Sequence, residues 1–273
     1  MLEITVIIPT FDRVTFIERA IGSVLNQSLA VNEIIVIDDG SHDGTKELIK
    51  TKYPQINYIY QNNKGVSAAR NKGISEANYD WIGFLDSDDA WKSNKIEKQI
   101  KAIKNSPDSL ICHTDEVWYR NGETLGQKNK HKKFGGYIFK YCLPLCIISP
   151  SSVIIHKKVF NEIGLFDEKL LACEDYDMWL RICSKYPVLF INEELTNKYG
   201  GHEDQLSKKY WGIDRFRIIA LEKIIKSNSL DTEQRKAAID SLLEKTNIFL
   251  KGCEKHGENK YSERFRKMKY RYA

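Results

Sequence analysis

The stretch Trp81-Ile82-Gly83-Phe84-Leu85-Asp86-Ser87-Asp88-Asp89 joins an apolar run, long enough for one buried strand, to three carboxylates within four residues. A buried strand cannot carry these charges inside, so we expect them in a loop at its carboxyl end. In an open parallel sheet, ligands bind at the carboxyl ends of the strands. An Asp-x-Asp there suits Mg²⁺ or Mn²⁺, held by one or two carboxylates and substrate phosphates. The alternative is a solvated turn whose side chains cap the next helix.

Four short apolar runs alternate with helical patterns in the first hundred residues. The runs cover residues 4–8, 34–37, 56–60 and 81–85, and Pro9 is expected to end the first. Continuous apolar strands separated by helices are typical of a parallel sheet that is covered on both faces. Right-handed crossovers and the common doubly wound arrangement predict the strand order 3-2-1-4. The fold class is therefore α/β, Rossmann-like and mostly parallel.

In that order the first and fourth strands are neighbours, and a crevice opens between their carboxyl ends. Three segments would line it, namely Pro9 to Arg13 (with Asp12), Asp38-Asp39 and Asp86 to Asp89. The chain has no GxGxxG after the first strand and no Walker-type loop, so a dinucleotide or P-loop site lacks its glycines. Acidic groups stand where those folds offer backbone amides, so we expect a metal to bridge them to phosphates.

The second half of the chain changes character. Leu110 to Tyr119 and Ser151 to His156 are predicted strands, and Glu174-Asp175-Tyr176-Asp177 reads as the start of a helix. Carboxylates in a first helical turn are stabilised by the helix macrodipole by about 0.3–1 kcal/mol. Stabilisation of the helix is therefore an alternative to a catalytic role for Glu174 and Asp175.

Composition limits the classes of protein to which this chain can belong. The 273 residues are 42% hydrophobic with a net charge of +5, which supports a core and a mildly basic surface. We expect no signal peptide, and no apolar run approaches the roughly 20 residues of a membrane helix. The six cysteines lack zinc-type spacing, which predicts free thiols in a reducing cytoplasm.

After Leu206 the pattern is helical, and the basic, aromatic end suggests contact with an anionic membrane or a partner. Nucleic-acid binding is not expected, because the basic excess is small and local.

Five short motifs occur in an order that resembles family-two glycosyltransferases of the GT-A fold, which include bacterial enzymes that build surface polysaccharides. The motifs are IPTFDR (8–13), DDGSHDGT (38–45), GVSAARNKG (65–73), DSDD (86–89) and EDYDMWLR (174–181). The resemblance covers roughly residues 3–205. It implies a GT-A domain over 1–205, with a nucleotide-binding half over about 1–108 and an acceptor half over about 109–205. Residues 206–273 would form a C-terminal helical extension with a basic tail.

The resemblance implies roles for the nucleotide-binding segments. Pro9, Thr10 and Phe11 would hold the base and ribose, with Phe11 against the ring. Asp39 would accept a hydrogen bond from the base, as on uracil. The residues that would support or complete this pocket are Asp12, Arg13, Asp38, Arg70, Asn71 and Ser87.

The resemblance also implies the reacting groups. Asp86 would lie near the ribose or donor sugar, and Asp88, with Asp86, would coordinate Mn²⁺ or Mg²⁺ on the diphosphate. His202 would reach the metal or diphosphate, unless it is an ordinary surface-loop histidine. Asp175 matches the general base, and Glu174 lies beside it.

The expected activity is inverting transfer of a sugar from a nucleoside-diphosphate sugar, with UDP the expected nucleotide. The acceptor would be a hydroxyl of a glycan or lipid-linked glycan, at the inner membrane face if the basic tail contacts lipid. A nucleotidyltransferase with a similar sheet is one alternative, although its phosphate loop after the first strand is missing. A non-catalytic protein that binds nucleotide sugars is the other.

Overall fold

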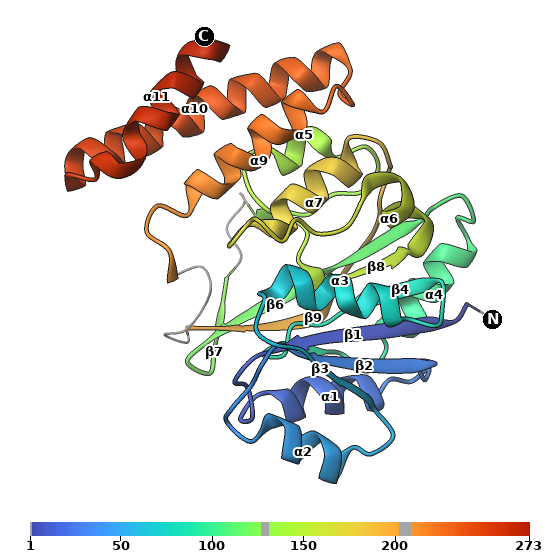
Figure 1. The fold of residues 1–273 in the computed structure, drawn as a ribbon. Helices are drawn as coiled ribbons and strands as arrows, with labels where there is room; N and C mark the ends of the chain where they lie inside the picture. The colour runs from blue at the N-terminus through green and yellow to red at the C-terminus, as the bar shows by residue number, and fades with distance from the viewer. Residues whose placement is uncertain (1, 127–130, 202–208) are drawn as a thin grey trace.

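The computed structural model describes residues 2–126, 131–201 and 209–273 (Figure 1). Its strands form one mixed sheet in the order β3-β2-β1-β4-β8-β6-β9-β5, with β7 paired to β6. The predicted order 3-2-1-4 is confirmed, and these four strands are parallel. Antiparallel β8 (Val153–His156) joins them to the second half of the sheet. The other strands are β1 (Ile4–Thr10), β2 (Glu33–Asp38), β3 (Asn57–Tyr60), β4 (Trp81–Phe84), β5 (Ala90–Trp91), β6 (Ile111–Arg120), β7 (Glu123–Leu125) and β9 (Leu189–Gly200).

Pro9 does not end the first strand, as the sequence had suggested, because β1 continues to Thr10. The last bond between β4 and β1 runs from the Leu85 amide to the Ile7 carbonyl at 3.0 Å. The next bond of a parallel ladder would need an amide hydrogen at residue 9, which proline lacks. On the other side β1 stays paired with β2 as far as Asp38. Pro9 therefore ends the pairing with β4, at the point where the crevice was predicted.

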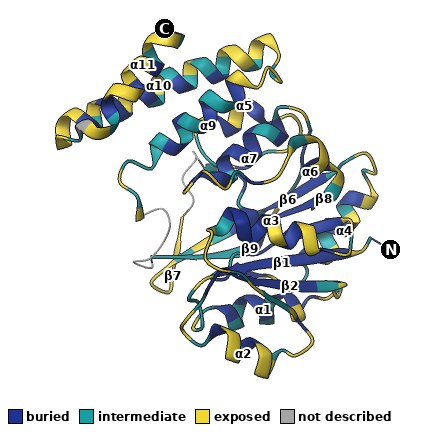
Figure 2. Ribbon diagram, in the orientation of Figure 1, coloured by how far each residue is buried: buried dark blue, intermediate teal, exposed yellow. Residues whose placement is uncertain are grey.

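Helices cover both faces of the sheet, and the residues between the sheet and these helices are buried (Figure 2). On one face α1 (Ile17–Leu25), α2 (Thr45–Lys52) and α4 (Lys95–Lys104) pack on Val6, Ile8 and their neighbours. On the other face Ile7, Ile35 and Phe84 belong to the core beneath the remaining helices. Alternate residues of β1 thus face opposite layers, as a strand covered on both faces requires. The helices that contribute to this second core are α3 (Val66–Glu76), α5 (Phe139–Cys142), α6 (Lys157–Ile163), α7 (Glu174–Cys183), α9 (Asp214–Lys226) and α10 (Thr232–His256), of which α9 and α10 form an outer layer on α7 and α5.

Helix α3 lies close against β1 because Gly73 has no side chain. A Cβ at this position would be 2.4 Å from Cγ2 of Ile7, well inside van der Waals contact. The helix can therefore approach the sheet closely and bring Arg70, one turn earlier, to the ends of β1 and β4.

The C-terminal helices α9, α10 and α11 (Asn259–Tyr272) pack above α7 and α5 (Figure 1). Phe249 of α10 meets Phe265 of α11 with ring centroids 4.7 Å apart. Lys223 of α9 pairs with Asp177 of α7 at 2.9 Å, which ties α9 to the helix that carries Glu174 and Asp175. Among the described residues, no helix has both the length and the apolar character needed to cross a bilayer.

Lys95 on α4 is fully buried, and this predicts a pH dependence of stability. Its Nζ bonds Oε1 of Gln99 at 2.7 Å and lies 4.0 Å from the centroid of the Trp91 ring. Burial lowers the pKa of Lys95 to about 7, and the nearby Cys112 opposes this shift. The unfolded chain, with a lysine pKa of about 10.4, binds more protons between these values, so stability rises with pH across this window.

Lys95→Met should therefore remove a stability gain of up to about 4 kcal/mol between pH 7 and 10. Urea unfolding at several pH values measures it. Lys101→Met, at an exposed position of the same helix, is the control and should keep the wild-type slope. Parallel slopes in wild type and Lys95→Met would show that Lys95 does not titrate in this range.

Candidate active site

A cleft of about 840 Å³ lies at the carboxyl ends of β1, β2 and β4, and the loops around 145–150, 168–175 and 209–217 close its other side. Most of the predicted site residues line it, although they come from distant parts of the sequence. They are Pro9, Thr10, Phe11, Arg13, Asp39, Arg70, Asp86, Ser87, Asp88, Glu174 and Asp175. The metal candidate Asp88 and the base candidate Asp175 thus share one cleft.

Three predicted residues support this cleft from outside its wall. Asp12 accepts a hydrogen bond from the His42 amide at 2.8 Å, and buried Asp38 accepts one from the Ser41 amide at 2.8 Å. Asn71 exchanges two hydrogen bonds with the backbone of Phe166, each 2.9 Å long. These side chains shape the loops around the cleft. The fourth exception, His202, lies outside the described residues.

Asp39 organises the loop between β3 and α3. Its Oδ1 accepts hydrogen bonds from the Lys64 amide at 2.8 Å and the Gln61 side chain at 2.7 Å. Its Oδ2 accepts one from the Gly65 amide at 2.8 Å. Two carboxylate oxygens offer about four acceptor positions, so one position remains for a ligand donor.

The acidic turn after β4 is held in place by Ser151. The Ser151 hydroxyl donates to Oδ2 of Asp89 at 2.6 Å and accepts from the Asp86 amide at 3.1 Å. The Trp91 indole donates to the Ser151 carbonyl at 2.6 Å. Ser151 lies in the segment that leads directly into β8. A residue next to the second half of the sheet therefore fixes the carboxylates that follow β4.

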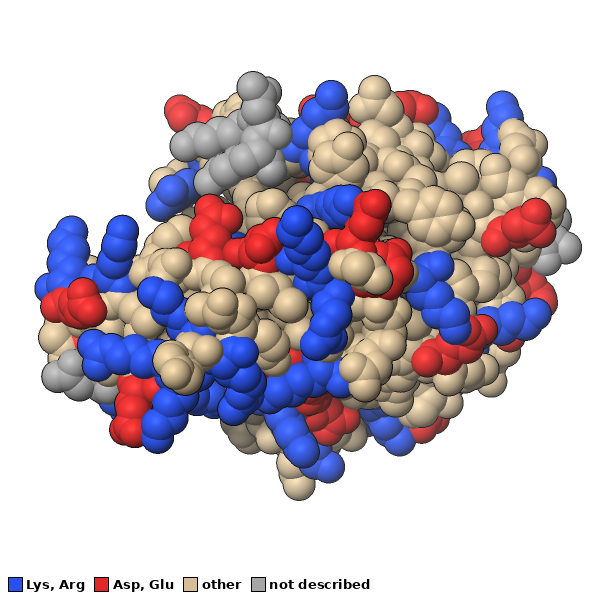
Figure 3. All heavy atoms as spheres, turned by 90° about the horizontal axis from the view of Figure 1, so that it is seen from above, with Lys and Arg blue, Asp and Glu red and all other residues tan. Residues whose placement is uncertain are grey.

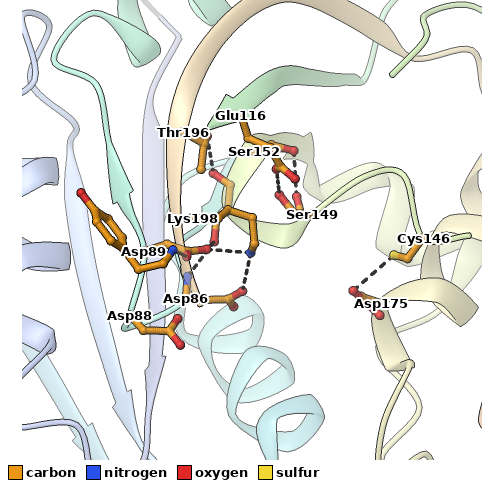
Figure 4. A network of polar contacts seen from close by, with 12 residues as sticks. Asp86, Asp88, Asp89, Glu116, Cys146, Ser149, Ser152, Asp175, Thr196 and Lys198 are labelled. Carbon is orange, nitrogen blue, oxygen red and sulfur yellow. Dashed lines mark hydrogen bonds and ion pairs between the residues drawn. The ribbon is translucent and has the colours of Figure 1, made fainter. Parts of the chain in front are cut away.

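Lys198 of β9 reaches this turn and was missed by the sequence analysis. Its Nζ lies 2.8 Å from Oδ2 of Asp89 and 3.7 Å from Oδ2 of Asp86. Figure 4 shows Lys198 between these two carboxylates, whereas Asp88 lies apart from them and has no such contact. Burial lowers the pKa of Lys198, but the charges of Asp89 and Asp86 outweigh this and raise it well above its usual value. Lys198 is therefore a fixed cation beside the acidic turn.

Arg70 joins the two halves of the site. Its guanidinium donates to Asp86 at 2.8 Å and to Glu174 at 2.7 Å, and it is almost completely buried. Burial would raise the pKa of Asp86, but Arg70 and Lys198 lower it overall. Burial and the charge of Asp175 raise the pKa of Glu174, which Arg70 offsets in part. Glu174 is thus engaged in a structural ion pair, which leaves Asp175 as the freer carboxylate.

Of the carboxylates in the acidic turn, Asp88 is the one whose negative charge is least balanced by an ion-pair partner. It forms no ion pair with a described residue. Burial and the charge of Asp86 raise the pKa of Asp88, and Lys198 and Arg13 offset only part of this. The described residues contain no cluster of three or more His, Cys, Asp or Glu side chains suited to a metal ion. One uncompensated carboxylate still fits a divalent cation that is shared with the phosphates of a ligand.

Asp175, in the first turn of α7, is held by two weak or local donors. Its Oδ1 accepts from the Tyr176 amide at 2.7 Å, and its Oδ2 accepts from the Cys146 thiol at 3.3 Å (Figure 4). Burial and the nearby Asp175 raise the pKa of Cys146 well above its usual value, so this side chain remains a thiol. A thiol is a weak donor, so Asp175 keeps acceptor capacity for an incoming hydroxyl. No motif in the sequence pointed to Cys146.

The fold and the cleft define the class of protein. The strands of the parallel half of the sheet end in acidic loops. The second half of the chain adds the mixed part of the sheet and a helix with carboxylates in its first turn. Together these two halves form the GT-A architecture. The chain belongs to glycosyl transferase family 2, whose model matches residues 5–164.

Individual relatives agree with this assignment. The chain is 39% identical over 224 residues to the putative teichuronic acid biosynthesis glycosyltransferase TuaG of Bacillus subtilis, with 78% of this chain and 87% of TuaG covered. It is 35% identical over 202 residues to an uncharacterized glycosyltransferase of Rickettsia felis, with 71% of this chain and 32% of that protein covered. The chain thus spans about a third of the length of several curated relatives it matches.

Solved structures show the same fold. S. aureus TarS has a TM-score of 0.68 and 17% sequence identity, with 90% of this chain and 43% of that chain covered. The structure of TarS 1–349 in complex with UDP has a TM-score of 0.65 and 19% identity, with 90% and 71% covered.

Proposed function

We propose that this protein is an inverting glycosyltransferase that moves a sugar from a nucleoside-diphosphate sugar to an acceptor hydroxyl of a glycan or lipid-linked glycan. One observation carries the proposal. Asp88 and Asp175 line the same cleft, and neither forms an ion pair with a described residue. One carboxylate is thus available for the charge of a diphosphate-bound cation and the other for a proton. Family membership supports sugar transfer over the nucleotidyltransferase alternative.

The proposed donor carries UDP. TarS, which shares the fold, has been solved in complex with UDP and with UDP-GlcNAc. In this chain Phe11 lines the cleft with 42% of its surface exposed, so its ring is available to a base. The acceptor position left on Asp39 suits the N–H of uracil.

In the proposed reaction the acceptor hydroxyl attacks the anomeric carbon, the bond to the diphosphate breaks, and Asp175 takes the hydroxyl proton. General-base assistance of this kind contributes about 10²–10⁴ in rate. The other carboxylates of that side of the cleft have partners. Glu174 pairs with Arg70, Glu116 with Lys133 at 3.1 Å, and Glu168 accepts from Asn71 at 2.9 Å. A nucleophilic carboxylate is therefore not at hand among the described residues, which favours a single displacement with inversion.

Asp88 would hold a divalent cation, Mn²⁺ or Mg²⁺. When bound, such a cation stabilises negative charge on the leaving diphosphate. Asp86 is already paired with Arg70 and lies near Lys198, so it contributes to the site mainly by fixing the turn.

A thermal-shift screen of UDP, GDP, CDP and ADP with and without Mn²⁺ tests this proposal. A ligand that binds only the native state at 100 times its Kd adds about 2.7 kcal/mol of stability. We expect UDP with Mn²⁺ to raise Tm most, and Asp88→Asn to remove the part that depends on Mn²⁺. Asp108→Asn, an exposed carboxylate outside the cleft, is the control. Equal stabilisation by UDP with and without Mn²⁺ would exclude the metal role of Asp88.

The products separate the alternatives. Incubation with a UDP-sugar and an acceptor should release UDP. Release of pyrophosphate from a nucleoside triphosphate and a sugar phosphate would indicate a nucleotidyltransferase, and tight binding without turnover of either kind would indicate a binding protein.

We also propose that the reaction takes place in the cytoplasm, with peripheral contact between α11 and the inner membrane face. The six cysteines are free thiols, as a reducing compartment favours. Figure 3, the view onto the C-terminal helices, shows Lys and Arg side chains gathered on this side. Lys260 and Arg264 are exposed and form no ion pair with a described residue, and Tyr270 is 90% exposed.

Vesicle sedimentation tests this contact. The chain should sediment with vesicles that contain anionic lipid and remain free with neutral ones. The double variant Lys260→Gln/Arg264→Gln should bind roughly 10-fold or more weakly, because each basic residue near the surface contributes about 1 kcal/mol. Lys46→Gln, on α2 at the opposite end of the molecule, is the control (Figure 1). Equal sedimentation of all three proteins would remove α11 from this role.

A further inference from the structure

The C-terminal helix α9 contributes to the candidate active site, although it lies beyond the residues that the family model matches. Arg217 of α9 lines the same cleft as Asp175, together with Lys209 and Tyr210 just before the helix. Ion pairs from Lys223 to Asp177 at 2.9 Å and to Asp167 at 2.6 Å fix α9 against α7 and the loop before it. The position of Arg217 relative to Asp175 is therefore set by packing between two helices.

The guanidinium of Arg217 has spare hydrogen-bonding capacity. Its Nη1 donates to Asp214 at 2.6 Å, and its Nε is buried without a hydrogen-bond partner within the described chain. The side chain is 21% exposed, whereas that of its partner Asp214 is 42% exposed and more open to solvent. A guanidinium carries five N–H donors in a planar fork that matches the oxygens of carboxylates and phosphates. Arg217 thus offers donors to a ligand in the cleft.

The surroundings of Arg217 suit an anionic group. The residues that line the cleft together with Arg217 include the apolar side chains of Leu145 and Ile213 and the ring of Tyr210. Charge-assisted hydrogen bonds are stronger in a less polar environment than in water. Lys209 also lines the cleft, is exposed and forms no ion pair with a residue that the structure describes. The cleft that contains Asp175 therefore also offers cations and apolar surface to an acceptor.

We propose that Arg217 binds an anionic group of the acceptor, a phosphate or a carboxylate, close to the hydroxyl that Asp175 deprotonates. This inference rests on the proposed function and narrows it, because the acceptor is then an acidic glycan or a phosphate-linked lipid glycan. Arg217 is a specificity residue in this scheme, and α9 connects the C-terminal extension to the choice of acceptor.

Matched acceptors test the proposal with the full chain. The probes are a neutral alkyl glycoside, the corresponding uronic acid glycoside and the same sugar joined to the alkyl chain through a phosphodiester. We expect wild type to use at least one anionic probe with kcat/KM about 10-fold or more above the neutral probe. Arg217→Met should lower kcat/KM for that probe by roughly 10–100-fold and leave the neutral probe nearly unchanged. A preference for the uronic acid indicates an acidic glycan, and a preference for the phosphodiester indicates a lipid-linked acceptor.

Asp214→Asn distinguishes acceptor binding from a structural role. This variant removes the carboxylate that pairs with Arg217 but leaves the charge of Arg217 in place, so the preference for the anionic probe should remain. Equal losses on neutral and anionic probes in both Arg217→Met and Asp214→Asn would show that the pair only stabilises α9, and would overturn the proposal. A wild-type preference for the neutral probe would overturn it as well.

A binding measurement separates this inference from the proposed function. Calorimetric titration of the probes into protein saturated with UDP and Mn²⁺ requires no turnover. The anionic probe should bind wild type and lose affinity in Arg217→Met by the same 10–100-fold. Failure of UDP to bind would reject the proposed donor, whereas anionic and neutral probes that bind equally would reject the role of Arg217.

Discussion

Asp175→Asn is expected to lower kcat by about 10²–10⁴ and to leave donor affinity nearly unchanged. The amide retains the shape of the side chain and can still accept the Tyr176 amide hydrogen, but it cannot take up a proton at neutral pH. The loss should therefore appear in kcat for transfer, because the interaction concerns the attacking hydroxyl and not the nucleotide.

Initial rates of UDP release at saturating donor measure this effect, and the Tm shift caused by UDP shows that the variant still folds and binds. Asp240→Asn, an exposed carboxylate on α10, should retain wild-type kcat. Wild-type turnover in Asp175→Asn would remove Asp175 from the reaction. In that case Asp175 would keep the role of a helix-start carboxylate, which the sequence left as an alternative.

Arg70→Met is expected to destabilise the protein by about 3–5 kcal/mol, because it leaves the buried Glu174 without its cation and Asp86 with only Lys198 nearby. Arg70 and Glu174 are 4% and 6% exposed, and their ion pair is 2.7 Å long. The matched control is Lys72→Met on the same helix, where the pair with Glu76 is exposed and 2.7 Å long. Removal of that exposed pair should cost about 0.5 kcal/mol or less. Urea unfolding measures both.

The pH dependence adds a second readout to this comparison. An uncompensated buried carboxylate has a folded-state pKa above its unfolded value, so its cost is present at neutral pH and disappears as the pH falls. The difference in the free energy of unfolding between wild type and Arg70→Met should thus narrow as the pH falls from neutral into the acidic range. Arg70→Met/Glu174→Gln should recover part of the loss at neutral pH, because one buried charge is removed. Equal costs for Arg70→Met and Lys72→Met would contradict a central role for the buried pair.

The parallel half of the sheet was predictable because its information is local. Continuous apolar runs at 4–8, 34–37 and 81–85 can be stable only as strands covered on both faces, and the acidic residues that follow can lie only at their ends. The start of α7 at Glu174 was likewise readable from carboxylates that precede apolar residues. The prediction that Pro9 ends the first strand was wrong, because Pro9 ends only the pairing with β4 and β1 continues to Thr10.

Strand β9 was not predicted, and Lys198 was missed with it. Residues 189–200 begin with three apolar residues but continue with a mostly polar stretch that has no clean alternation, and this stretch forms a strand because β6 offers it a partner. Cys146 and Arg217 carried no local signal either, since each lies in a segment whose position depends on packing against α7.

The sequence by itself determined the parallel half-sheet, the order of its strands and the presence of acidic loops at their ends. These features depend on burial and backbone sterics within short segments, where neighbouring residues supply the decisive interactions. The tertiary structure decided which carboxylates are compensated. Asp86 and Asp88 are alike in sequence, yet Asp86 meets Arg70 and Lys198, and Asp88 meets neither in an ion pair. Coulomb interactions depend on distance in space, and the fold alone brings residues 70, 86, 174 and 198 together.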